Sequence, residues 1–96
     1  MVDRRVVLLS VQRALLGSVT PTMRGLAVYF DDDRIKLMAY FDGNISTDDE
    51  EAMAEVDTQV FGDFPYMSVS TALTRIDFPS PLPQAEIWAI LRREPV

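Results

Sequence analysis

The sequence predicts an α+β fold in which two helices pack on one face of a four-stranded, mainly antiparallel sheet. Three observations carry this prediction. The spacing of apolar residues switches between the helical and the alternating pattern, a polar turn joins two alternating segments, and the elements follow in the order αββαββ. With 96 residues, the chain is expected to form a single domain over residues 1–96.

The first element is predicted as a helix from about Arg4 to Leu16. Its apolar side chains recur at spacings of three and four, which indicates one buried stripe. Gly17 can take the left-handed conformation that ends a helix, and Pro21 prevents its resumption. The residues of the stripe are Val7, Leu8, Val11, Ala14 and Leu15.

Residues 24–30 and 35–41 alternate in polarity on either side of the polar stretch 31–34, which predicts a β-hairpin. If Asp32 and Asp33 form the loop, one face is almost wholly apolar, and a slip of one residue would mix the faces. The expected pairs on that face are Phe30 with Ile35, Val28 with Leu37, Leu26 with Ala39 and Arg24 with Phe41. On the other face they are Tyr29 with Lys36, Ala27 with Met38 and Gly25 with Tyr40.

A second helix is predicted to begin at Ser46 or Thr47 and to end near residues 62–63, ahead of a proline. Either start places an acid three residues on, Asp49 or Glu50, close to the capping-box pattern. Further acids fill the first turn, where the helix dipole favours negative charge. The expected buried stripe is Met53, Val56, Val60 and Phe64.

Residues 67–77 are rich in Val, Thr, Leu and Ile and predict a third strand. Residues 78–83 form a stiff loop because they contain three prolines. Residues 86–93 alternate as a fourth strand, with Ile87, Ala89 and Leu91 on one side and Trp88, Ile90 and Arg92 on the other. The sheet face away from the helices is expected to be partly open to water and to carry Tyr29, Met38, Tyr40 and Trp88.

The residue types present exclude several kinds of chemistry. Cysteine and histidine are absent, so the chain has no disulfide, no thiolate metal site and no Ser–His or Cys–His nucleophile pair. The glycines are scattered and form no phosphate loop. A weak cation site at Asp42, Gly43 and Asn44 with the acids 48–51 stays open, although helix capping explains the acids more simply. We expect a protein that is not an enzyme, with no cofactor and no metal.

The net charge points to a protein partner. A formal charge of -6, with Lys36 as the only lysine, disfavours nucleic acid. The apolar runs are too short for a membrane span or a signal peptide, so we expect no membrane binding and a cytoplasmic location. An acidic surface suits a basic protein partner, although it also keeps a domain soluble.

The expected docking surface is the acidic start of the second helix with the aromatic sheet face beside it. Acidic side chains would steer a basic partner, and an exposed tyrosine would supply apolar area. The candidate partner-binding residues are Tyr40, Asp42, Asp48, Asp49, Glu50, Glu51 and Glu55.

Three phrases, taken in order, resemble small bacterial immunity proteins of contact-dependent growth inhibition toxin systems: VQRALLGSVTPTMRGLAVYF, AYFDGNISTDDEE and RIDFPSPLP. The resemblance covers residues 9–83. It implies a non-catalytic cytoplasmic protein that covers the active site of a cognate toxin, often a ribonuclease. Such toxins tend to have basic clefts, so the resemblance implies a use for the acidic surface. It assigns no site residues.

Two other hypotheses remain open. A self-associating structural or accessory subunit of a cytoplasmic complex would bury Tyr29, Met38 and Trp88 in a symmetric homodimer. A metal-supported enzyme would require a cation at the acidic loop near Asp42.

Overall fold

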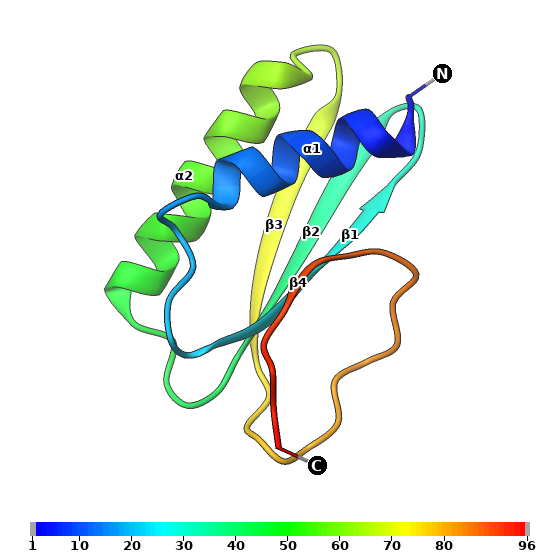
Figure 1. Cartoon of the computed structure of the whole chain (residues 1–96). Helices are drawn as coiled ribbons and strands as arrows, with labels where there is room; N and C mark the ends of the chain where they lie inside the picture. Colours follow the sequence, from blue (N-terminus) through cyan, green and yellow to red (C-terminus); the bar gives the residue numbers. More distant parts are fainter. Residues whose placement is uncertain (1, 96) are drawn as a thin grey trace.

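The computed structural model describes residues 2–95 and contains the six expected elements in the expected order (Figure 1). The helices are α1 (Arg4–Leu15) and α2 (Thr47–Asp63). The strands are β1 (Met23–Phe30), β2 (Arg34–Phe41), β3 (Ser68–Arg75) and β4 (Trp88–Leu91). The predicted α+β fold with the order αββαββ is confirmed.

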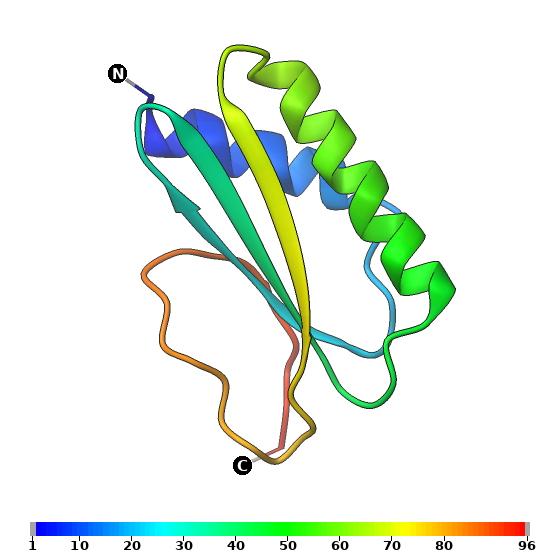
Figure 2. The same ribbon diagram turned by 180° about the vertical axis from the view of Figure 1, so that it is seen from behind.

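The sheet has the strand order β3-β2-β1-β4. β1 is antiparallel to both β2 and β4, whereas β2 and β3 are parallel. The parallel pair follows from the connection, because a helix between two neighbouring strands returns the chain to the end where the first strand began. The sheet is therefore mostly antiparallel, and β3 lies at its edge beside α2 (Figures 1 and 2).

Both helices pack on one face of the sheet, and no helix in residues 2–95 covers the other face (Figure 2). The predicted stripes are confirmed, although Leu8 and Phe64 are only partly buried. α1 ends at Leu15, one residue earlier than predicted, and Gly17 has the expected positive φ of 80°. The fully buried side chains that join helices to sheet include Val7, Val11, Leu26, Leu37, Phe41, Val56 and Val60.

The hairpin register is confirmed at six of the predicted pairs. The prediction for Arg24 is wrong, because Met23 and not Arg24 lies opposite Phe41. A register shift between Met23 and Gly25 inserts one extra residue into β1, as in a β-bulge. Because of the bulge, Arg24 has no partner residue in β2, and its side chain makes the hydrogen bonds described in the next subsection.

The predicted alternation of the fourth strand is also wrong. β4 is shorter than expected, and a register shift places Ile90 opposite Leu26 and Trp88 opposite Ala27. One extra residue between these pairs breaks the alternation. As a result Leu91, expected beside Ile87 and Ala89, lies opposite Gly25 on the helix-free face.

Candidate partner-binding surface

A capping box holds the acidic start of α2. Ser46 Oγ accepts a hydrogen bond from the Asp49 amide, and the Asp49 carboxylate accepts one from the Ser46 amide, both at 3.0 Å. Burial raises the pKa of Asp49, but hydrogen bonds from Ser46, Thr20 and Thr22 outweigh it and hold the pKa below its usual value. Asp49 is 3% exposed, so its carboxylate serves the helix start.

Between residues 48 and 55 of α2, four acids face solvent, and we call them the acidic face: Asp48, Glu50, Glu51 and Glu55. α2 contains no lysine or arginine. Three of the acids lie three or four residues apart on one side of the helix, where like charges repel by roughly 0.2–0.5 kcal/mol per pair. This repulsion opposes the stabilisation that the helix dipole gives to the acids of the first turn, and the acidic face creates a negative potential at the surface of α2.

Tyr40 does not belong to this surface. Only 4% of it is exposed, and its ring packs against Trp88 with centroids 6.0 Å apart. Burial raises the pKa of the Tyr40 hydroxyl. The expectation of a partly exposed Tyr40 is wrong because Trp88 packs closely over Gly25, where a Cβ atom would lie 3.0 Å from the Trp88 ring.

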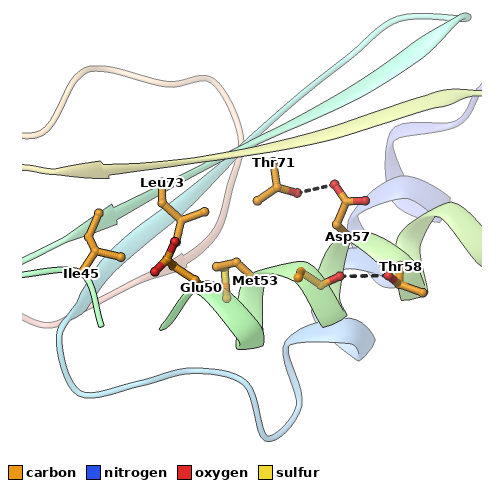
Figure 3. Close-up of a pocket in the computed structure, with 8 residues that line it drawn as sticks. Ile45, Glu50, Met53, Asp57, Thr58, Thr71 and Leu73 are labelled. Atoms are coloured by element: carbon orange, nitrogen blue, oxygen red, sulfur yellow. Dashed lines mark hydrogen bonds between the residues drawn. The ribbon is translucent and has the colours of Figure 1, made fainter. Parts of the chain in front are cut away.

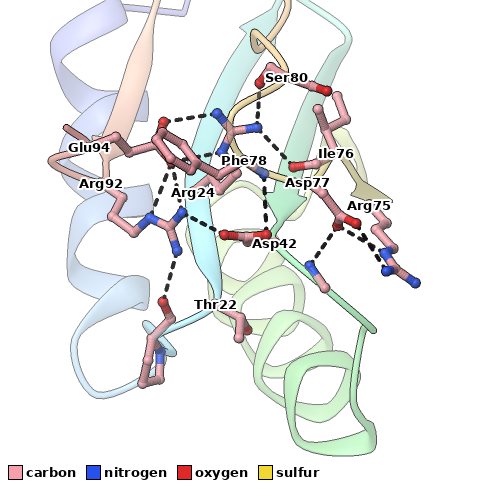
Figure 4. A network of polar contacts seen from close by, with 12 residues as sticks. Thr22, Arg24, Asp42, Arg75, Ile76, Asp77, Phe78, Ser80, Arg92 and Glu94 are labelled. Atoms are coloured by element: carbon pink, nitrogen blue, oxygen red, sulfur yellow. Dashed lines mark hydrogen bonds and ion pairs between the residues drawn. The ribbon is translucent and has the colours of Figure 1, made fainter. Parts of the chain in front are cut away.

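Arg24 is the centre of a buried polar network at the end of the sheet (Figure 4). Its side chain is 3% exposed and donates two hydrogen bonds to the Glu94 carboxylate, at 2.7 and 2.9 Å. It also donates to the carbonyl oxygens of Ile76 and Ser80, at 2.9 and 2.7 Å. A single arginine thus ties the segment after β3 and the segment after β4 to β1.

Asp42 belongs to the same network. Arg92 donates to Asp42 at 3.0 Å and to Glu94 at 2.9 Å (Figure 4). The hydrogen bonds from Arg24 and Arg92 lower the pKa of Glu94 to about 2, against the opposing effect of burial. The Asp42 carboxylate therefore pairs with Arg92 of the C-terminal segment, whereas none of the acids of the acidic face forms an ion pair among residues 2–95.

Two of the side chains that the sequence offers to a cation are bonded to arginines. Asp42 accepts from Arg92, and the Asn44 side chain accepts from Arg75 at 2.6 Å. In the described part of the chain, no group of three or more acidic side chains is placed to hold a metal ion. Over the same residues, neither helix is long and apolar enough to cross a bilayer.

A groove of about 650 Å³ lies between α2 and the edge strand β3 (Figure 3). α2 contributes Glu50 and Asp57 to its wall, and β3 contributes Thr71 and Leu73. The Thr71 hydroxyl donates to Asp57 at 2.8 Å. Sequence reasoning missed this groove because it assigned no strand order, although a strand–helix–strand sequence favours parallel neighbours with the helix packed over them.

The helix-free face of the sheet is partly apolar. Tyr29 is 40% exposed and Leu91 is 54% exposed, while Met38 and Trp88 are half-buried. Lys36 lies on the same face, opposite Tyr29. The expected exposed surface is therefore present, with Leu91 in place of Tyr40.

Comparison with known proteins gives a family match that spans nearly the whole chain. Residues 4–94 match the family model described as MafI2 immunity protein. No curated protein matches the chain. The family match takes in all six elements and confirms the immunity-protein part of the resemblance seen in the sequence. The chain therefore belongs to the MafI2 immunity protein family, and with it to the immunity proteins of bacterial toxin systems.

Proposed function

We propose that this protein neutralises a cognate toxin in the cytoplasm by binding it without catalysis, and that the acidic face of α2 makes the main contact. One observation carries the proposal. Among residues 2–95, none of the four acids of this face forms an ion pair, whereas six other acids do. Their charge is thus available to a partner.

The chemistry of such a partner follows from the sign of the charge. A concentrated negative potential accelerates the approach of a basic surface and orients it. A nuclease needs a basic cleft, because affinity for phosphate backbones comes from lysine and arginine. We therefore propose a nuclease toxin whose basic cleft is covered by α2. Contact-dependent growth inhibition is the delivery system that the sequence resemblance suggests.

The test is co-expression with the toxin domain encoded directly upstream of this gene. The proposal predicts that cells expressing the toxin grow only when this protein is present, and that the two chains elute together in size-exclusion chromatography. It also predicts that the complex weakens as salt increases. Growth arrest despite the protein, with no shared elution peak at low salt, would contradict the proposal.

Self-association is a second candidate function, favoured by the exposure of Tyr29 and Leu91 on the helix-free face. A symmetric dimer would bury both side chains together with Met38 and Trp88. Light scattering over a range of concentrations tests this candidate. A monomer at every concentration would remove it and leave toxin binding unaffected.

A further inference from the structure

β3 is an edge strand without the usual protection. It pairs with β2 at all eight positions, and in residues 2–95 no strand lies on its other side. Natural edge strands are commonly short, or carry proline, lysine or a bulge that prevents further pairing. The sequence of β3 contains no proline and no lysine, and its register with β2 has no shift. A further strand can therefore pair with it.

The backbone groups available on this edge follow from the hydrogen bonds at its two ends. The Ser68 amide donates to Asp33 and the Ile76 amide donates to Phe41, both at 2.9 Å. Successive residues of a strand direct their N–H and C=O groups to opposite sides, so the even-numbered residues between them also face β2. The residues that direct their backbone groups outward are Val69, Thr71, Leu73 and Arg75.

The groove lies directly beside these outward groups. Thr71 and Leu73 form its β3 side, and Glu50 and Asp57 form its α2 side (Figure 3). A strand added next to β3 would place every second side chain under α2, because side chains alternate between the two faces of a sheet. Side chains that enter there meet two carboxylates, so lysine or arginine is the complementary choice.

We propose that the toxin docks by β-augmentation: an extended segment of the toxin that bears lysine or arginine pairs with β3 and directs its basic side chains into the groove toward Glu50 and Asp57. Backbone hydrogen bonds along the edge supply affinity, and the groove selects the side chains. This inference rests on the proposed function, since it names the edge and the kind of segment through which neutralisation occurs.

Residue-resolved amide hydrogen exchange tests the pairing directly, with the full chain alone and in complex with the toxin domain encoded upstream. The outward amides of Val69, Thr71 and Leu73 should exchange fast in the free protein and slow by at least about tenfold in the complex. Those of Ser70 and Ala72, which already face β2, should be protected in both. A stable complex with unchanged outward amides would overturn the inference and leave toxin binding intact. Absence of any complex would defeat both.

A matched pair of variants tests the same edge. Thr71→Pro removes an outward N–H without removing a bond to β2, whereas Thr71→Val removes the hydroxyl but keeps that N–H. We expect Thr71→Pro to weaken the complex by at least about tenfold, and Thr71→Val by no more than about threefold. Equal affinities of the two variants would contradict strand pairing.

A second pair of variants tests the docking site if Thr71→Pro fails to fold. Glu50→Lys reverses a charge in the groove, and Glu55→Lys makes the same change on α2 outside it. Both should slow association, but Glu50→Lys should speed dissociation about tenfold more than Glu55→Lys, because it acts on the groove that holds the basic side chains in the bound state. Identical dissociation rates would show that the groove takes no part in binding.

Discussion

The two helices pack on the same face of the sheet and bury stripes of the same kind, yet they present opposite charge to solvent. α1 contains Arg4, Arg5 and Arg13 and no acid. α2 contains seven acids and no base. The side that faces the core determines packing, and the outward side is left free to carry charge that a partner recognises. The acids of α2 are Asp48, Asp49, Glu50, Glu51, Glu55, Asp57 and Asp63.

The helices also differ in what lies beside them. α1 crosses the sheet, whereas α2 runs along the edge strand β3 (Figures 1 and 2). Glu50 and Asp57 of α2 therefore lie beside the unpaired edge of β3. A ligand that is both basic and extended would find its two complementary features on one side of the molecule.

The largest effect on stability is expected outside both helices, at Arg24. The losses expected for variants within the helices are compared with this value. Arg24→Met should lower the free energy of unfolding by about 3 kcal/mol, because it leaves Glu94 without its main partner in a largely buried site. Urea denaturation measures this loss. A loss below about 1 kcal/mol would show that the network does not hold the C-terminal segment.

The pH dependence of stability offers an independent reading of the same network. The pKa of Glu94 is lowered from 4.5 to about 2, so its stabilising contribution is complete above pH 4.5 and is lost as the pH falls toward 2. Denaturation curves of the wild type should show this loss over that range. The Arg24→Met variant should lose less, because its Glu94 keeps a pKa nearer the ordinary value.

Equal truncations in the two helices test whether their buried sides are equivalent. Val11 and Val56 are both fully buried. Val11→Ala and Val56→Ala should each lower the free energy of unfolding by about 2 kcal/mol, since each deletes two buried methyl groups. A difference of more than about 1 kcal/mol between the two losses would show that the buried sides of the two helices are not equivalent.

Removal of the cap at each helix start should lower stability by different amounts in the two helices, and by less than the core truncations do. Ser46→Ala should cost about 1 kcal/mol, because it removes the oxygen that accepts the hydrogen bond from the Asp49 amide, one of the two bonds of the capping box. Asp3→Ala should cost less, since the Asp3 carboxylate that caps α1 is solvent-exposed. Thermal unfolding followed by circular dichroism compares the two variants, and a larger loss for Asp3→Ala would contradict this ranking.

The smallest effect is expected where the helices touch. Asp63 accepts from the Ser10 hydroxyl at 2.6 Å and from Arg13 at 3.1 Å. Because Asp63 and Arg13 are largely exposed, Asp63→Asn should cost about 0.5 kcal/mol. Chemical denaturation at low and high salt measures it. A cost above about 2 kcal/mol would mean that opposite charge, and not the shared core, holds the helices together.

Local features of the fold were predictable from sequence, whereas features set by distant residues were not. The hairpin register and the Ser46 cap depend on neighbours a few residues away. At the bulge, the Arg24 side chain bonds to Ile76 and Glu94, and the residues next to Arg24 in the sequence do not indicate these contacts. The extra residue in β4 follows a long loop whose path is fixed by the same contacts.

The negative charge of the candidate surface was predictable from the sequence, but the residues that belong to the surface were not. Composition and helix position identified the exposed acids of α2. They did not distinguish those from Asp42, which bonds Arg92, or Asp49, which caps the helix. Burial of Tyr40 under Trp88 depends on a cross-strand approach at Gly25. A charged residue in a sequence does not reveal which partner it has in the fold.

Association kinetics test most directly the claim that α2, and not α1, receives the toxin. The two variants to compare with the wild type are Glu51→Lys/Glu55→Lys in α2 and Arg4→Glu/Arg5→Glu in α1. At low salt the α2 variant should bind the toxin domain at least about tenfold more slowly, and the gap should close at high salt. The α1 variant should bind no more slowly than the wild type. An unchanged rate for the α2 variant, or an equal loss for the α1 variant, would contradict this account.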